Sequence, residues 1–315
     1  MTNGAIRGRF APSPTGEIHL GNAWTALLAW LQVRAAGGTM VLRIEDLDPD
    51  RSRPAYSEAL IAEMKWLGLD WDEGPDSGGK YAPYCQDERR GLYQAALERL
   101  DAAGLVYPCY CTRTELAASA PHAGEQERVY PGICRQRTID PARRAKRRPA
   151  LRLAVPPGEI SFTDLHAGWI SQDISREVGD FVVRRSDGVH AYQLAVVVDD
   201  AAMQITHVLR GDDLLRSTPR QLLLYRLLGL KAPVFTHVPL LIDNQGYRLS
   251  KRQQALSIAA LRSQGVKPEA IIGYLAWKAG LLDQYQPVKA AELVGSFALA
   301  RMPSGPVVVD CPLPV

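Results

Sequence analysis

Hydrophobic and polar positions follow two rhythms in the first part of the chain. Arg7 to Phe10 is short and extended, and Pro12 to Gly16 predicts a turn, because its prolines and glycine fit neither a helix interior nor a central strand. Apolar residues at three- and four-residue steps predict a helix from Leu20 to Ala36, ended by Gly37-Gly38. Met40 to Ile44 predicts a buried strand. Strand, turn, helix and strand in this order open a parallel α/β sheet.

Two more helices are predicted before this pattern stops. One runs from about Ser57 to Leu67, and the other begins near Asp87, a good N-cap, and ends at Gly104. Between Val106 and about Asp187 cysteines, prolines, basic runs and short strand-like pieces replace the alternation. We therefore predict an inserted subdomain there. Its strand-like pieces are Ala150 to Val155 and Phe181 to Arg184.

The α/β pattern returns after the insertion. Tyr192 to Val198 is strongly β-branched and predicts a strand, and Ile205 to Leu209 predicts another. Pro219 to Leu228 predicts a helix with Thr218 as its cap. The C-terminal part is expected to be helical, and the tail after Met302 to be poorly structured. The expected helices are Ile258 to Arg262, Pro268 to Ala279 and Lys289 to about Phe297.

Composition places the chain among ordinary globular proteins. Hydrophobic residues make up 46% and charged residues 23% of its 315 residues, and the net charge of +3 neither demands nor excludes a nucleic-acid partner. No run of eighteen apolar residues appears, and the N-terminus lacks the pattern of a signal peptide. We therefore predict a cytoplasmic protein with no membrane contact.

A glycine-containing motif spans the predicted junction between turn and first helix, Thr15 to Asn22. A helix N-terminus presents unpaired N–H groups and a positive dipole, which suit a polyphosphate. Gly21 allows a flat ring to approach the backbone, and His19 can donate to phosphate oxygens. Taken alone, the motif is more often a turn with an incidental histidine.

A second motif, Arg248 to Arg252, places three cations in five residues. Such a cluster can neutralise the charge that develops on a leaving pyrophosphate. Alone it is more often a solvated basic loop. Together, a phosphate-binding helix start and a cationic loop some 230 residues later predict a two-sided nucleotide site.

The five cysteines predict a metal rather than a disulfide framework, because their number is odd and three of them lie close together. Cys109, Cys111 and Cys134 offer three thiolates, whereas structural zinc prefers four ligands. His122 is one candidate for the fourth position, and three unmetallated thiols are the alternative to a metal site. Cys85 and Cys311 look unrelated to it.

Five separated motifs together resemble the glutamyl-tRNA synthetase family of class I aminoacyl-tRNA synthetases. The resemblance runs in order from about residue 7 to 255. The motifs are Arg9 to Gly21, Arg43 to Asp48, Ala195 to Asp200, Arg210 to Asp213, and the loop containing Leu249 to Arg252. The resemblance implies an α/β, Rossmann-like catalytic domain interrupted by a small zinc-containing insertion, with a short helical C-terminal region and no anticodon-binding domain.

The corresponding domain limits are 1–105 and 191–240 for the two halves of the catalytic domain, 106–190 for the insertion, and 241–315 for the lysine loop and helical region. The resemblance also implies Tyr130 as the fourth zinc ligand beside the three cysteines, with one structural zinc per chain.

The family activates L-glutamate with ATP and magnesium to form glutamyl-adenylate, and the resemblance extends this chemistry to the chain. By resemblance, His19 and Lys251 stabilise the transition state in which pyrophosphate leaves. The implied ATP-binding residues are Thr15, His19, Gly21, Asn22, Arg248, Ser250 and Lys251. The motifs depart from the family pattern at Asn22, Arg248 and Gln193, where histidine, lysine and asparagine are usual.

The implied glutamate-binding residues are Arg9, Phe10, Ala11, Pro12, Ser13, Glu45, Tyr192 and Arg210. Arginine suits bidentate capture of a carboxylate, so Arg9 and Arg210 match an acidic substrate. Glu45 can hold the substrate ammonium group, and Tyr192 can donate to a carboxylate. A glutamine substrate is disfavoured, because a neutral amide leaves a guanidinium unpaired.

The chain has about 60 residues after the cationic loop, too few for the helical anticodon-binding region of the long family members. Short members of the family transfer glutamate to queuosine, a modified base in the anticodon of tRNA(Asp). The chain resembles these members in its length. The rivals are a minimal enzyme that charges tRNA(Glu) and a non-catalytic paralogue that binds glutamate or tRNA. Arg143 to Arg148 is either a track for the RNA backbone or a solvated loop. We expect a monomer.

Overall fold

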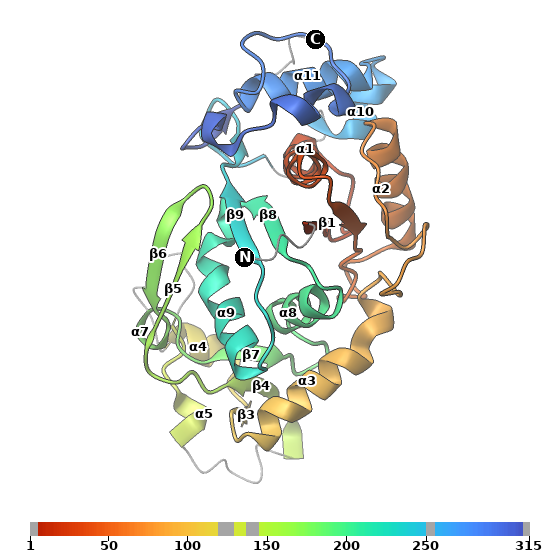
Figure 1. Ribbon diagram of the computed structural model, residues 1–315. Helices are drawn as coiled ribbons and strands as arrows, with labels where there is room; N and C mark the ends of the chain where they lie inside the picture. Colours follow the sequence, from red (N-terminus) through yellow and green to blue (C-terminus); the bar gives the residue numbers. More distant parts are fainter. Residues whose placement is uncertain (1–5, 119–128, 137–144, 250–255, 311–315) are drawn as a thin grey trace.

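The computed structural model describes residues 6–118, 129–136, 145–249 and 256–310 (Figure 1). Its centre is a four-stranded parallel sheet in the order β2-β1-β8-β9. The strands are β1 (Arg7–Phe10), β2 (Thr39–Leu42), β8 (His207–Gly211) and β9 (Val234–Val238). The two inner strands come from segments about 200 residues apart, so the sheet forms only when both halves of the chain meet. This confirms the predicted parallel α/β sheet.

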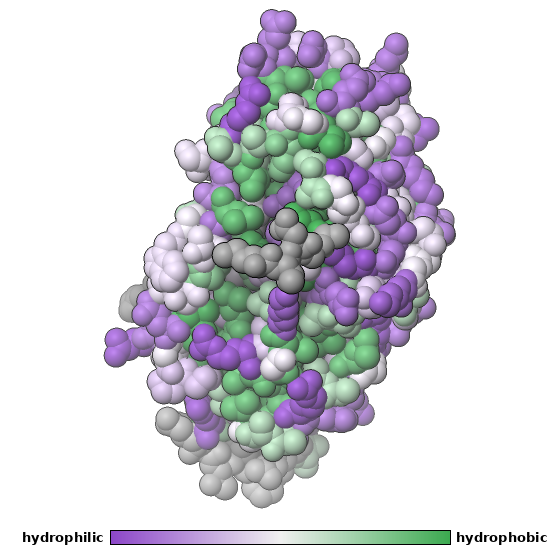
Figure 2. Space-filling model, in the orientation of Figure 1, coloured by the Kyte–Doolittle hydropathy of each residue, from purple (hydrophilic) through white to green (hydrophobic). Residues whose placement is uncertain are grey.

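Helices cover both faces of this sheet because alternate strand residues point to opposite sides. Met40 and Leu42 join a core with α1 (Leu20–Ala35), α2 (Pro54–Trp66) and the C-terminal helices, whereas Val41 joins the opposite core. The opposite core contains α3 (Arg90–Ala102), α8 (Tyr192–Ala202) and α9 (Thr218–Leu227). Figure 2 shows one side of the whole molecule, with hydrophobic residues both above and below its middle and hydrophilic residues along its right-hand edge.

The insertion follows α3 and forms its own small antiparallel sheet, in the order β3-β4-β7, at the bottom of Figure 1. A separate hairpin, β5–β6, packs along β9 of the four-stranded sheet. The elements are β3 (Val106–Cys109), α4 (Arg113–Ala118), α5 (Ile133–Gln136), β4 (Ala150–Leu153), β5 (Glu159–Asp164), β6 (Gly168–Asp173), α7 (Ile174–Glu177) and β7 (Phe181–Arg184).

The C-terminal part packs over α1 at the top of Figure 1. Its elements are β10 (Leu241–Ile242), α10 (Ile258–Ser263), α11 (Pro268–Lys278), η4 (Ala290–Ser296), η5 (Leu299–Arg301) and β11 (Val307–Val308). The segment expected as a helix after Lys289 is a 3-10 helix. The prediction of a poorly structured tail is wrong as far as residue 310, because β11 pairs with β10 in parallel and buries Val309. That pairing joins distant segments and leaves no local signal.

The prediction of a strand from Tyr192 to Val198 is also wrong, since the segment lies in helix α8. Every residue from Leu194 to Asp200 is buried. A helix surrounded by core on all sides lacks a polar stripe, so its sequence resembles a buried strand. Asp87 is not the cap of α3 either: it begins a 3-10 turn, η1 (Asp87–Arg89), and the cap is Arg89. Another 3-10 helix, η2 (Asp212–Ser217), precedes α9, whose cap is Ser217 rather than Thr218.

Candidate active site

A cavity of about 400 Å³ opens at the carboxyl ends of β1, β2 and β8. This is the edge of a parallel sheet where ligands of α/β proteins bind. Every described residue of the two predicted substrate sets lines it. These are Arg9, Phe10, Ala11, Pro12, Ser13, Thr15, His19, Gly21, Asn22, Glu45, Tyr192, Arg210 and Arg248. Ser250 and Lys251 lie outside the described residues.

The start of α1 orients the first motif. His19 caps the helix: its Nδ1 accepts from the backbone N–H of Gly21 at 3.0 Å, and its own N–H donates to Asn22 Oδ1 at 3.1 Å. Because Nδ1 is an acceptor, the proton of the neutral ring sits on Nε2, which makes Nε2 a donor. Gly21 is required by this packing, since a Cβ there would lie 2.9 Å from the His19 ring.

The segments that bear the two motifs meet in space. His19 forms a β-bridge with Ser257, just beyond the cationic loop, and Ile258 N–H donates to the Ile18 carbonyl at 2.9 Å. On the near side of that loop, Arg248 lines the cavity and forms an ion pair with Asp213 at 2.6 Å. Asp213 was not predicted as a site residue, although it belongs to one of the recognised motifs.

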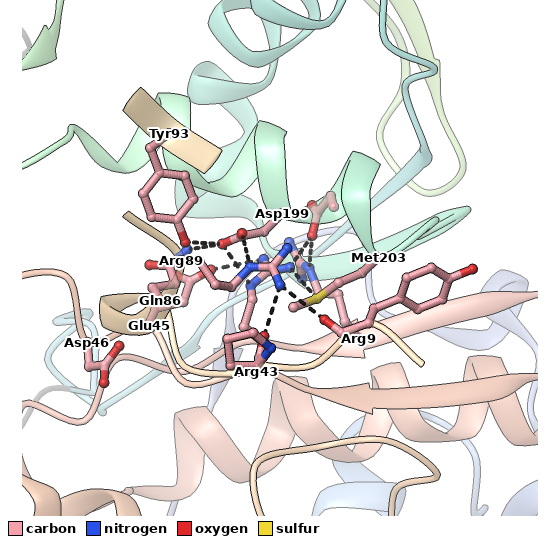
Figure 3. A network of polar contacts seen from close by, with 12 residues as sticks. Arg9, Arg43, Glu45, Asp46, Gln86, Arg89, Tyr93, Asp199 and Met203 are labelled. Atoms are coloured by element: carbon pink, nitrogen blue, oxygen red, sulfur yellow. Dashed lines mark hydrogen bonds and ion pairs between the residues drawn. The ribbon is translucent and has the colours of Figure 1, made fainter. Parts of the chain in front are cut away.

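A buried ionic network lies beneath the cavity (Figure 3). Arg43 is fully buried and donates to Asp200 of α8 at 2.7 Å and to Glu45 at 3.1 Å. Asp200 also holds Nε of Arg9 at 3.4 Å. Arg43 and Asp200 therefore fix the two cavity residues whose charges oppose each other, Arg9 and Glu45. Arg43 and Asp200 lie within recognised motifs, yet neither was predicted as a site residue.

The neighbouring carboxylate of Asp199 belongs to the same buried network (Figure 3). It accepts from Arg89 at 2.6 Å, from Gln86 at 2.7 Å and from the Tyr93 hydroxyl at 2.8 Å. The carboxylate has enough donors to remain in a buried position, which an unpaired charge could not do. Helix α8 is thus anchored to the first half of the catalytic domain by two adjacent aspartates.

Burial and charge set the protonation of the cavity residues. Burial raises the pKa of Glu45, and the guanidinium groups of Arg43 and Arg9 only partly offset this. Burial acts in the same direction on Asp200, but there the guanidinium groups of Arg43 and Arg9 prevail and hold its pKa below the ordinary value. Burial raises the pKa of the Tyr192 hydroxyl, which therefore stays a neutral donor.

The cysteines of the insertion converge as predicted. The sulfur atoms of Cys109, Cys111 and Cys134 lie within 4.8 Å of one another, and all three cysteines are free. The Tyr130 hydroxyl lies 3.5 Å from the sulfur of Cys109 and 3.6 Å from that of Cys111. These four side chains could hold one metal ion, as a soft, sulfur-rich ligand set does. His122, the alternative ligand, lies outside the described residues.

The comparisons with known proteins agree with this fold. Residues 5–304 match the catalytic domain of the class I tRNA synthetases for E and Q, and the chain belongs to this family. The chain is 56% identical to the glutamyl-Q tRNA(Asp) synthetase of Symbiobacterium thermophilum, over 95% of this chain and 94% of the relative. The protein of that name from Nitratidesulfovibrio vulgaris is 54% identical, over 96% and 95%. The predicted family is therefore confirmed.

A solved structure shows the same architecture. The glutamate-tRNA synthetase of Elizabethkingia anophelis superposes with a TM-score of 0.85 at 30% identity, over 98% of this chain and 68% of that one. Within the residues that the structure describes, no helix is both long and apolar enough to cross a membrane.

Proposed function

We propose that the protein activates L-glutamate with ATP and transfers it to the queuosine base in the anticodon of tRNA(Asp). The observation that carries the activation of glutamate is the shared cavity. A helix start suited to phosphate, at His19, and two cations suited to carboxylates, Arg9 and Arg210, line this one cavity. The transfer to queuosine is supported by the two relatives named glutamyl-Q tRNA(Asp) synthetase, which match this chain along nearly their whole length.

In the activation step, a carboxylate oxygen of glutamate attacks the α-phosphorus of ATP, and the bond to the departing pyrophosphate breaks. Magnesium bound with ATP neutralises part of the phosphate charge. His19 donates from Nε2 to phosphate oxygens, and the N–H groups at the start of α1 add positive potential. Arg248 and Lys251 balance the charge of the leaving pyrophosphate. The remaining proposed ATP contacts are Thr15, Gly21, Asn22 and Ser250.

The same cavity is suited to an acidic amino acid. Arg210 has a buried Nη1 without a partner among the described residues, so it favours a carboxylate over the weaker acceptor of an amide. Arg9 supplies a second cation. We assign Glu45 to the substrate ammonium group and Tyr192 to a substrate oxygen. Phe10, Ala11, Pro12 and Ser13 form the wall between them.

ATP–pyrophosphate exchange without any tRNA tests the activation step. We expect exchange with glutamate, and less than about a hundredth of that rate with glutamine, because the amide leaves a buried guanidinium unpaired. His19→Ala should reduce the exchange rate. Absence of exchange in the wild-type protein would favour the non-catalytic paralogue.

Transfer of labelled glutamate tests the acceptor. We expect label on tRNA(Asp) that contains queuosine, none on the unmodified tRNA, and retention of label after removal of the 3′-terminal adenosine. Label on tRNA(Glu) that is lost with its terminal adenosine would instead identify a minimal glutamate–tRNA ligase.

We further propose that the metal is zinc, one per chain, held by Cys109, Cys111, Cys134 and Tyr130. Zinc would supply folding energy to this loop-rich part of the insertion, which has a small core of its own. We place the protein in the cytoplasm as a monomer. The domain limits 1–105, 106–190, 191–240 and 241–315 remain proposals, and the basic run 143–148 lies partly outside the described residues.

A further inference from the structure

Arg210 is held by protein atoms on the side away from the cavity. Its Nε donates to His237 Nε2 at 3.0 Å, and its Nη2 donates to Thr218 Oγ1 at 2.8 Å. The guanidinium also lies over the ring of Phe235, 5.1 Å from its centre. Nη1 is buried and has no partner among the described residues, although the side chain lines the cavity. Nη1 is therefore the nitrogen that is left for a ligand.

The contact between Arg210 and His237 defines the state of the imidazole. Arginine can only donate, so Nε2 of His237 has to be an unprotonated acceptor. The ring proton then sits on Nδ1, which lies 2.7 Å from Oδ2 of Asp164. The ring of His237 is stacked on Phe235, with centres 6.0 Å apart and planes 13° apart. The imidazole is thereby fixed in both tautomer and orientation.

Asp164 is built as the fixed end of this chain of hydrogen bonds. Its carboxylate accepts from the backbone N–H groups of His166 at 2.9 Å, Ala167 at 2.8 Å and His237 at 3.1 Å, besides the imidazole. The side chains of Asp164 and His237 are completely buried. Asp164 ends strand β5 of the inserted hairpin, whereas His237 lies on β9 and Arg210 on β8. Asp164 of the insertion is thus linked to the cavity residue Arg210 through the imidazole of His237.

We propose that Asp164 and His237 are positioning residues, which hold Arg210 so that its free nitrogen meets the carboxylate of the acidic substrate. The inserted hairpin β5–β6 then takes part in amino-acid selection. This inference rests on the proposed function for the identity of that substrate, glutamate. A guanidinium held at two nitrogens presents the third in one direction, which reduces the ordering cost of binding.

Three substitutions test separately the two hydrogen bonds of this relay, from His237 to Asp164 and from Arg210 to His237. Asp164→Asn offers an amide donor to Nδ1 and favours the tautomer with its proton on Nε2, which then faces the donor of Arg210. His237→Gln keeps an acceptor near the position of Nε2. His237→Asn keeps a donor near Nδ1 but cannot reach Arg210. The matched control is Asp173→Asn, which changes a carboxylate of the same hairpin that caps α7.

We expect Asp164→Asn and His237→Asn to raise the KM for glutamate in pyrophosphate exchange, and the Kd for glutamate in calorimetry, by about 10- to 100-fold. The KM for ATP should change less than about twofold. His237→Gln should retain more of the wild-type glutamate affinity than His237→Asn, and Asp173→Asn should match the wild type.

The inference is overturned if folded Asp164→Asn and His237→Asn bind glutamate as the wild type does, or if the KM values for ATP and glutamate rise together. It is equally overturned if His237→Gln and His237→Asn behave alike. A wild-type protein that shows no glutamate binding would overturn the proposed function as well. Wild-type binding with unaffected variants would overturn only the relay.

Discussion

At the scale of single residues, the site depends on a few side chains whose partners are set by the backbone around them. His19 is both a helix cap and a candidate hydrogen-bond donor to phosphate, because its Nδ1 accepts from the helix backbone and the ring proton therefore sits on Nε2. Glu45 and Arg9 are held in the cavity by the same buried pair, Arg43 and Asp200. Residues of this kind could be listed from the motifs, but their hydrogen-bond partners could not.

Gly21 provides a test of the helix start. Gly21→Ala should lower the pyrophosphate exchange rate by about tenfold or more, because a Cβ would meet the His19 ring at 2.9 Å and displace it. Gly91 is the matched control, since it is also the second residue of a helix and a Cβ placed there would have no neighbour within 4 Å. Gly91→Ala should preserve activity. Equal rates for both variants would show that the His19 ring does not contact the nucleotide.

Glu63 on α2 should make stability depend on pH. Burial and the nearby Glu17 carboxylate raise its pKa from 4.5 to about 7, and its Oε2 has no hydrogen-bond partner among the described residues. A folded-state pKa above the unfolded value means that the folded state binds more protons in this window. The contribution of Glu63 to the free energy of unfolding is therefore fully present below pH 4.5 and is lost as the pH rises through about 7.

The variant Glu63→Gln removes this titration. Its free energy of unfolding in urea should exceed that of the wild type by roughly 1–2 kcal/mol at pH 8, and the difference should shrink toward pH 5. Glu58→Gln, at an exposed position of the same helix, serves as the control. A pH-independent difference between Glu63→Gln and the wild type would contradict the assignment.

At the scale of elements, burial on all sides decided where local patterns failed. Helix α8 carries a β-branched, apolar run that favours a strand, yet it forms a helix because core surrounds it and its two aspartates must reach partners from different elements. Strand β11 forms only because β10 offers a free edge to it. The insertion was recognised from composition, although the contact of its β5–β6 hairpin with β9 was not.

The proposed zinc site in the loop-rich part of the insertion gives a further test. Cys134→Ser should lower the zinc content from about one per chain to nearly none and increase amide hydrogen exchange in β3 and α5, because a structural metal contributes folding free energy. Tyr130→Phe removes the phenol and should weaken zinc binding by about 10-fold or more, as expected for a lost ligand. Metal content is measured by mass spectrometry.

Cys85→Ser is the control for this experiment, because Cys85 packs against the catalytic core and lies outside the cysteine cluster. Burial raises the pKa of its thiol to about 12, so it remains protonated. Zinc content that falls equally in Cys85→Ser and Cys134→Ser would argue against the cluster as the metal site.

At the scale of the whole molecule, the two halves of the catalytic domain are joined across the insertion by a buried ion pair. Arg43 belongs to the first half and Asp200 to the second, and both are almost without solvent contact. Arg43→Met should destabilise the protein by about 3–5 kcal/mol in urea unfolding, because it removes the cation that lies nearest to the buried carboxylates of Asp200 and Glu45. It should also impair glutamate binding, since Arg9 and Glu45 lose their support.

The matched control is Arg34→Met, at an arginine whose partners Asp70 and Asp72 are largely exposed. Its cost should stay within about 1 kcal/mol, as for surface ion pairs. If Arg43→Met proved no more destabilising than Arg34→Met, the pair between Arg43 and Asp200 would not be what joins the halves.

The sequence by itself determined the family, the parallel α/β character and many of the polar residues that line the cavity. Those features depend on residue types at short spacings, such as a glycine beside a histidine at a helix start, or an arginine at the end of a strand. Tertiary structure alone decided that α8 is a helix, that Arg43 and Asp200 support Arg9 and Glu45, and that Asp164 of the insertion reaches Arg210 through His237. The reason is physical: the stability of a buried polar group depends on partners that lie tens or hundreds of residues away, and local patterns carry no record of them.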